Sequence, residues 1–265
     1  MDDIIKNQLL LFKEKLISYL ARYETSTLSN EEITEQANIK ATLERIEMML
    51  ASMSRTEALQ NEPSSAQKGL IETDPKGWLD VMTDDGQRIT ISKYTRVTYH
   101  GYNSDKTRET FTILDWPNEN IEASVSAISA SKSRFAATVY QGPGVVTFDL
   151  DNNRLKYGNS AWIHTATDIN NPISKGSYNL WLPDGVHTYG NPYLGLSNYA
   201  TVWYRIGAEG SSRYFHVGNV SAGCVTVGEA STGGQDVDKK QWTDIYNYLK
   251  TRRSGSKHVG TINII

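Results

Sequence analysis

Residues 214–227 read Tyr-Phe-His-Val-Gly-Asn-Val-Ser-Ala-Gly-Cys-Val-Thr-Val, and the fold prediction starts from this stretch. Two runs rich in β-branched and aromatic residues, at 214–217 and 224–227, flank a loop of small residues. His216 lies near the end of the first run, and Cys224 opens the second run eight positions later. A tight loop between adjacent strands can return the chain so that imidazole and thiol face each other.

This pair has the chemistry that cysteine catalysis needs. The attacking species is the thiolate, and an adjacent imidazole can take the thiol proton. Small residues at Ala222 and Gly223 allow a substrate backbone to approach, and the N–H groups of Gly223 and Cys224 can point at a developing oxyanion. The alternative is that His216 is a satisfied strand histidine and Cys224, the single cysteine, a buried core residue.

The residues on both sides of this stretch predict a mostly β region after residue 70. Asp84-Asp85-Gly86 marks a hairpin turn, and 124–133 reads as a connection or a short helix. A late helix is expected at 236–250, with Trp242, Ile245, Tyr246 and Leu249 on one face. Strands are expected at 78–82, 88–92, 95–100, 110–114, 136–140, 145–150, 154–157, 178–182, 201–206, 214–217, 224–227 and 259–265.

The first 58 residues predict two amphipathic helices. One apolar stripe is Ile5, Leu9, Phe12, Leu16, Tyr19 and Tyr23, and the other is Ile39, Leu43, Ile46, Leu50 and Met53. The helices either form an antiparallel hairpin or pair between chains as a coiled coil, which would make a homo-oligomer. The predicted class is α+β, with a helical module at 1–60, a linker at 61–70, a β-rich accessory region at 71–133 and a catalytic region at 134–265.

The cysteine motif resembles that of the L,D-transpeptidase catalytic domain family. The family pattern has Ser, any residue, Gly, Cys and a β-branched residue, with a His upstream, and Ser221-Ala222-Gly223-Cys224-Val225 is similar to it. Residues 171–178, Asn-Pro-Ile-Ser-Lys-Gly-Ser-Tyr, also resemble the Pro-x-x-Lys-Gly-x-Tyr segment that precedes a core strand in this family. The resemblance covers about residues 134–265.

The resemblance implies a mixed β fold around a cysteine nucleophile that acts on peptidoglycan stem peptides. Cys224 would attack the peptide bond after a meso-diaminopimelate-type L-centre, D-alanine would leave, and the acyl group would pass to an amine or to water. His216 would be the base, Gly223 and Cys224 the oxyanion donors, and Ser221 a local hydrogen-bonding residue.

This sequence departs from the family in three places. The histidine is closer to the cysteine than is usual, Ala222 stands where His is frequent, and Thr226 stands where Arg often follows. These departures bear on substrate binding and favour hydrolysis relative to transfer.

Four further residues are candidates for substrate contact. His187 lies in a loop that would border the cleft, and Tyr204, Arg205 and Arg213 precede the catalytic segment. An arginine can grip a peptide carboxylate with two hydrogen bonds, although a surface ion pair is an equally good interpretation of each. Asp168, Asp184, Asp236 or a backbone carbonyl could orient His216.

Composition restricts the partners. The formal net charge of −3 implies no nucleic acid, and the five histidines show no metal-ligand spacing, so neither a metal nor another cofactor is expected. No signal peptide and no membrane span are recognisable. A cell-wall enzyme made this way would reach the periplasm or cell wall through a dedicated secretion machine, as a delivered antibacterial effector with an immunity protein in its producer. The alternative is a host cell-wall enzyme whose export signal is not included in this sequence.

Two other hypotheses stay open. One is a non-enzymatic, oligomerising interaction protein on a degenerate transpeptidase-like scaffold, and the other is a cysteine peptidase that acts on proteins.

Overall fold

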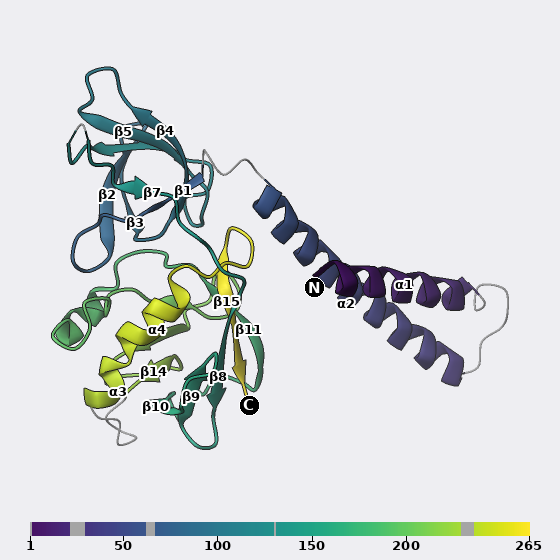
Figure 1. Ribbon diagram of the computed structural model, residues 1–265. Helices are drawn as coiled ribbons and strands as arrows, with labels where there is room; N and C mark the ends of the chain where they lie inside the picture. Colours follow the sequence, from purple (N-terminus) through teal and green to yellow (C-terminus); the bar gives the residue numbers. More distant parts are fainter. Residues whose placement is uncertain (1, 22–29, 62–66, 130, 229–235) are drawn as a thin grey trace. The chain divides into compact units, whose positions relative to one another are not determined.

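A computed structural model describes residues 2–21, 30–61, 67–129, 131–228 and 236–265 (Figure 1). The chain divides into two compact units, Met1–Glu62 and Pro63–Ile265. The class is α+β, as predicted, with a helical region first and mostly β structure after it. No helix in the described ranges is both long and apolar enough to cross a membrane.

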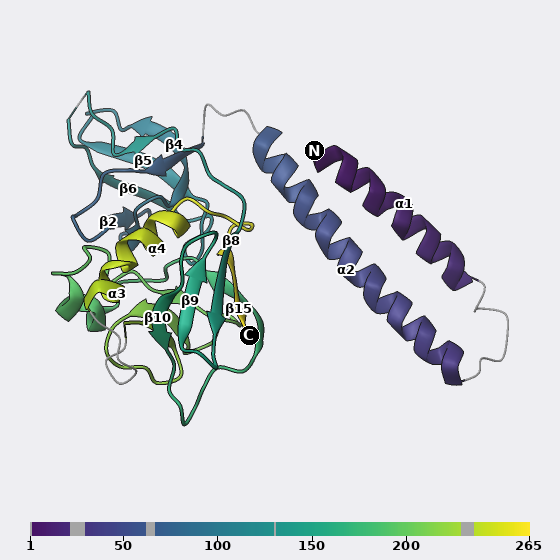
Figure 2. The ribbon, with the colours of Figure 1, turned by 60° about the horizontal axis from the view of Figure 1, so that its bottom comes forward.

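The first unit contains α1 (Asp2–Leu20) and α2 (Asn30–Asn61), which contact each other and lie side by side in Figure 2. The Lys13–Glu47 ion pair at 2.8 Å and the hydrogen bond from Tyr19 to Glu35 show that the helices run antiparallel. The predicted hairpin is therefore confirmed. Its apolar stripe is only partly covered, since Ile46 is buried while Phe12 remains about half exposed.

The second unit contains two β-sheets. The first has the order β3-β2-β6-β5-β4-β1-β7 and its own apolar core. Its strands are β1 (Gln67–Leu70), β2 (Trp78–Thr83), β3 (Arg88–Ser92), β4 (Arg96–Tyr102), β5 (Arg108–Ile113), β6 (Glu122–Ser126) and β7 (Phe135–Ala136). The predicted turn at 84–86 joins β2 and β3 in an antiparallel hairpin, with Gly86 at a φ of 83°.

The second sheet has the order β11-β15-β8-β9-β10-β14-β13-β12. Its strands are β8 (Gly144–Asp149), β9 (Arg154–Tyr157), β10 (Ile163–Ala166), β11 (Gly176–Trp181), β12 (Tyr204–Arg205), β13 (Tyr214–Val217), β14 (Val225–Val227) and β15 (His258–Ile264). A bridge from Leu180 to Ile206 and a hydrogen bond from the Gly207 N–H to the Asn179 carbonyl bring the two edges together. The sheet is thus a nearly closed barrel of mixed parallel and antiparallel strands.

Helix α4 (Trp242–Leu249) follows the short α3 (Asp236–Lys240) and closes the core of the second sheet. Trp242, Ile245, Tyr246 and Leu249 are all buried, which confirms the predicted apolar face. Burying these side chains stabilises the helix on the barrel, at roughly 1.5–3 kcal/mol for each large apolar side chain.

Four predictions of elements were wrong in part. The strand expected at 201–206 is reduced to β12, Tyr204–Arg205. Residues 67–70 are β1 and not linker, because β4 and β7 supply hydrogen-bond partners to a segment without an apolar pattern; 62–66 lie outside the described residues. Residues 122–126 form β6, in which Ala123 and Val125 point inward, although its Ser and Ala content suggested a connection. The strand expected at 136–140 stops at Ala136, because its partner β1 pairs with it over two residues only.

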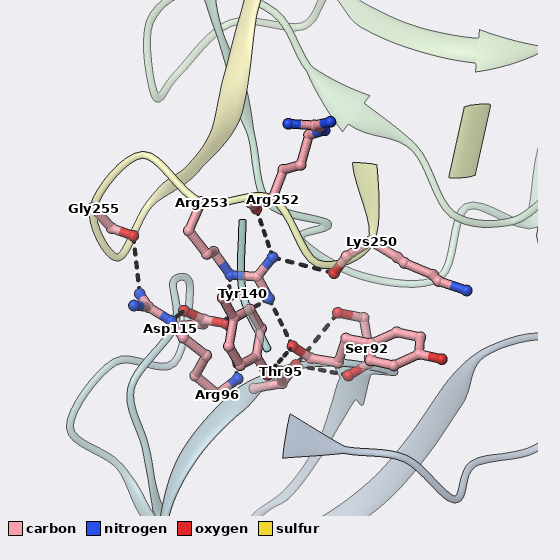
Figure 3. Close-up of polar contacts among 10 residues, drawn as sticks. Ser92, Thr95, Arg96, Asp115, Tyr140, Lys250, Arg252, Arg253 and Gly255 are labelled. Atoms are coloured by element: carbon pink, nitrogen blue, oxygen red, sulfur yellow. Dashed lines mark hydrogen bonds and ion pairs between the residues drawn. The ribbon is translucent and has the colours of Figure 1, made fainter. Parts of the chain in front are cut away.

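A buried ion cluster joins the two sheets within the second unit (Figure 3). The Asp115 carboxylate accepts hydrogen bonds from Arg96 Nε at 2.6 Å and from Arg253 Nη2 at 2.9 Å. Arg253 also donates to the Tyr94 carbonyl oxygen, and Arg96 donates to that of Gly255. This contact ties the first sheet to the barrel: one carboxylate is shared by two guanidinium groups, and backbone carbonyl oxygens accept from their remaining N–H groups.

Candidate functional site

The candidate site lies on β13 and β14, which are adjacent but parallel. Phe215, His216 and Val217 pair with Val225, Thr226 and Val227. The connection from 218 to 224 therefore crosses over between the strand ends and does not form a hairpin. Extending this register by one residue places Cys224 beside Tyr214. His216 lies two residues further along β13, so the Cα atoms of Cys224 and His216 are about 8 Å apart.

His216 is 4% exposed and has partners on both ring nitrogens. Nδ1 is 3.0 Å from the Val217 carbonyl oxygen, and Nε2 is 3.2 Å from the Thr226 hydroxyl. Because a carbonyl only accepts, Nδ1 carries the proton, and Nε2 accepts from Thr226. Burial lowers the pKa of His216 to about 4, so the ring is neutral near pH 7.

Cys224 is 8% exposed, and its Sγ accepts a hydrogen bond from the Tyr214 N–H at 3.3 Å. Burial raises the pKa of the thiol, against the opposing effects of this N–H and of the Arg213 charge. The resting pair is thus an uncharged thiol and an uncharged imidazole. No hydrogen bond joins them in the described part of the chain, and contacts of this kind are often loose before substrate binds.

Hydrogen bonds from Arg213 and Ser221 anchor the loop before Cys224. Gly223 has a φ of +85°, in the left-handed region, and its carbonyl oxygen accepts from Arg213. Arg213 also donates to the backbone and side-chain oxygens of Asn171, at 3.1 and 2.8 Å. Ser221 donates to the Cys224 carbonyl oxygen at 2.8 Å. Between residues 131 and 228, no acceptor is hydrogen-bonded to the N–H of Gly223 or Cys224.

An aromatic cluster covers His216. The Trp203 indole stacks on His216 at 4.1 Å and on His187 at 4.5 Å between ring centroids. Two rings centred this close to one indole would overlap if they shared a face, so Trp203 lies between the two imidazoles. Tyr214 contacts the His187 ring edge-to-face at 4.7 Å.

Asp184 is the centre of the polar network beside this cluster. Its carboxylate accepts from His187 Nε2 at 2.8 Å, from Arg205 Nη2 at 2.6 Å and from the Tyr214 hydroxyl at 2.9 Å. Burial by itself would raise the pKa of Asp184, but the hydrogen bonds from His187 and Tyr214 outweigh it and lower that pKa. Burial and the Asp184 carboxylate raise the pKa of Tyr214 to about 12, so its hydroxyl stays protonated.

The other predicted residues fall in three environments. Tyr204 is 1% exposed in the core of the barrel, so the prediction that it contacts substrate is wrong: it pairs with Phe215, whose side chain faces away from His216. Arg205 is engaged by Asp184 and by the Ser211 carbonyl oxygen. Arg213 holds the Gly223 loop, as described above.

None of the three aspartates proposed to orient His216 is bonded to it. The Val217 carbonyl does so, which was the backbone alternative. Asp236 pairs with Lys239, and Asp168 accepts from the N–H of Asn170.

Sequence reasoning missed Trp203 and Thr226 as parts of the site. Alternation along 203–205 places Trp203 and Arg205 on the opposite face from Tyr204, and this was the only signal for Trp203. Thr226 was noted only as a replacement for Arg, although His216 and Thr226 are direct register partners.

Within the described ranges, no group of three or more His, Cys, Asp or Glu side chains could hold a metal ion. In comparisons with known proteins, no protein family, no curated protein and no solved structure matches this chain.

Proposed function

We propose that this protein is a cysteine enzyme of the L,D-transpeptidase or L,D-carboxypeptidase type that acts on peptidoglycan stem peptides. The observation that carries the proposal is the neighbourhood of Cys224: a neutral imidazole on the adjacent strand, and the N–H groups of Gly223 and Cys224, which have no acceptor among the described residues. A thiol, a proton acceptor and oxyanion donors are what acyl transfer needs.

The proposed first half-reaction starts from the uncharged pair. His216 takes the thiol proton as Sγ attacks the carbonyl carbon, and the oxyanion forms against the N–H groups of Gly223 and Cys224. When the C–N bond breaks, His216 gives the proton to the departing amine, D-alanine, and an acyl-thioester remains on Cys224. Thr226 must release Nε2 for this transfer, which a small rotation of its hydroxyl allows.

The test is mass spectrometry of muropeptides that include tetrapeptide stems, incubated with the wild-type protein and with Cys224→Ala. Loss of the terminal D-alanine, a new cross-link or amino-acid exchange is expected, and each should be absent with the variant. Circular dichroism of both proteins controls for folding. Unchanged muropeptides at high protein concentration and long times would reject the proposal.

Alkylation of Cys224 alone does not distinguish this enzyme from a degenerate scaffold. Since burial raises the pKa of the thiol, slow alkylation near pH 7 is expected for either. The muropeptide experiment is therefore the decisive one.

A second candidate is a non-enzymatic, oligomerising interaction protein. The observation that favours it is the surface of α1, where Leu10, Leu11, Phe12 and Ile17 are all more than 40% exposed. Exposed apolar patches of this kind mark contacts with other chains. Both roles can coexist if the helical unit is a loading or oligomerisation module of a delivered antibacterial effector, with an immunity protein as a partner in its producer.

A further inference from the structure

The second histidine of the aromatic cluster, His187, has one ring nitrogen free. Its Nε2 is 2.8 Å from Asp184 Oδ1, whereas Nδ1 makes no hydrogen bond within the described part of the chain. The side chain is 19% exposed, compared with 4% for His216. A group that exchanges protons with solvent or with an acceptor molecule needs this combination of a fixed ring and an accessible nitrogen.

The tautomer of the neutral His187 ring follows from its partner. Asp184 is ionised and can only accept, so the imidazole nitrogen that faces it, Nε2, carries a proton. In the neutral ring, Nδ1 then presents a lone pair. A carboxylate that accepts from the far nitrogen also stabilises the imidazolium that forms when Nδ1 takes a proton.

The backbone holds this ring in place. The His187 N–H donates to the Thr201 carbonyl oxygen at 3.1 Å, and the His187 carbonyl accepts from Gly190 at 2.9 Å. Trp203 supports one face of the ring and Tyr214 its edge. Tyr214 links the ring to the thiol: its side chain contacts His187, and its backbone N–H is bonded to Cys224 Sγ.

His216 is less suited to a second proton transfer. Trp203 covers its ring, and His216 is 4% exposed, so an acceptor molecule from solvent reaches it less readily than it reaches the more exposed His187. Arg205, the other polar side chain beside the cluster, is bound to Asp184 and to the Ser211 carbonyl.

We propose that His187 is the general base of the second half-reaction, in which the acceptor attacks the Cys224 acyl-thioester, and that Asp184 is its positioning residue. This inference rests on the proposed function. Nδ1 takes a proton from the water or amine as the acceptor lone pair forms the bond to the acyl carbon. The C–S bond breaks, and the sulfur leaves as thiolate. The proton on His187 passes to solvent, and the thiolate takes one from solvent, so no proton is gained or lost.

The test compares wild-type protein with His187→Gln in single-turnover reactions on tetrapeptide muropeptides. Glutamine keeps an N–H for Asp184 and removes the basic nitrogen. The first burst of D-alanine is expected within about twofold of wild type. Turnover should fall by roughly 10²-fold, the scale of general base catalysis. The acyl-enzyme should then accumulate and be visible as an added mass on the intact protein.

The rate at which hydroxylamine releases the acyl group distinguishes loss of the base from a structural defect. Hydroxylamine is largely unprotonated at neutral pH, so it needs no base, and it should release the acyl group from His187→Gln at close to the wild-type rate. Asp184→Asn should accumulate the acyl-enzyme to a smaller extent. His100→Gln, in the first sheet, is the matched control and should behave as wild type.

The outcomes separate the two proposals. If wild-type protein never forms an acyl-enzyme, the proposed function fails, and this inference fails with it. If wild type acylates and His187→Gln turns over at the wild-type rate, only the role of His187 is overturned. Equal loss of the burst and of turnover in His187→Gln, without rescue by hydroxylamine, would also overturn it.

Discussion

At the scale of single residues, Gly223 sets the backbone conformation that presents Cys224. Its φ of +85° disfavours any side chain, and an added Cβ would lie 2.7 Å from the Asn171 carbonyl oxygen and closer still to Arg213. Gly223→Ala is therefore expected to lower the free energy of unfolding by about 1–3 kcal/mol. Urea denaturation measures this change.

Gly185→Ala is the control for Gly223→Ala, since an added Cβ there meets nothing within 4 Å. It should stay within about 0.5 kcal/mol of wild type. A Gly223→Ala protein as stable as Gly185→Ala would contradict the strained-loop interpretation.

His216 makes stability depend on pH. Burial lowers its pKa from 6.5 to about 4, so the unfolded chain binds a proton before the folded chain does. The contribution of His216 is fully present above pH 6.5 and is lost as pH falls toward 4, by about 3 kcal/mol in total. Urea denaturation at a series of pH values should show this slope, and the slope should be smaller in His216→Gln. Equal slopes in the two proteins would show that His216 is not the titrating group.

At the scale of elements, the 3₁₀ helix η2 (Thr188–Tyr193) links His187 to the loop at 218–224 that connects β13 and β14. The Tyr193 hydroxyl accepts from the Asn219 N–H at 2.8 Å. Gly190 packs against the segment that carries Trp203, where an added Cβ would lie 2.0 Å from the Ala200 carbonyl oxygen. The element therefore depends on a close backbone approach that no larger residue allows.

Gly190→Ala is expected to push η2 away from 199–203 and to lower the free energy of unfolding by about 1–3 kcal/mol. The near-ultraviolet circular dichroism of the stacked Trp203 should weaken at the same time. Gly195→Ala, which meets open space, is the control. Unchanged stability and an unchanged spectrum in Gly190→Ala would contradict this prediction and would mean that residues 199–203 shift at little energetic cost.

At the scale of the whole molecule, the cluster around Asp115 connects the two sheets of the second unit. Asp115→Ala leaves Arg96 and Arg253 buried and without their carboxylate, so a loss of about 3–5 kcal/mol is expected. Asp151→Ala removes the exposed pair with Lys175 and should lose no more than about 1 kcal/mol. Chemical denaturation measures the free energy of unfolding of both variants. Equal losses would contradict a stabilising role for the buried cluster around Asp115.

The helical unit is expected to associate through its own exposed side chains. Light scattering should give the full chain a mass of two or more copies, and residues 63–265 the mass of one copy. The shortened protein should keep the unfolding midpoint of the β unit, because residues 63–265 form a compact unit with their own cores. The same oligomeric state for both proteins would contradict the association.

The pattern of residues along the sequence was enough to predict the elements whose structure depends on residues close together in the chain. The helical stripes, the Asp-Asp-Gly turn after β2 and the apolar face of α4 were all predictable, because each depends on periodicity or turn preference within a few residues. The candidate pair was also visible, since Cys224 and His216 lie in one short stretch. Where partner strands supply the hydrogen bonds, as for β1 and β6, composition was misleading.

By itself, the sequence determined the α+β class, the helical hairpin and the presence of one cysteine close to a histidine. Only the tertiary structure decided that β13 and β14 run parallel, that the Val217 carbonyl orients His216, and that Tyr204 is in the core. It alone brought Asp184, His187 and Trp203 beside this pair. The physical reason is that strand direction and side-chain stacking depend on contacts between segments distant in the chain, and these form only when the barrel closes.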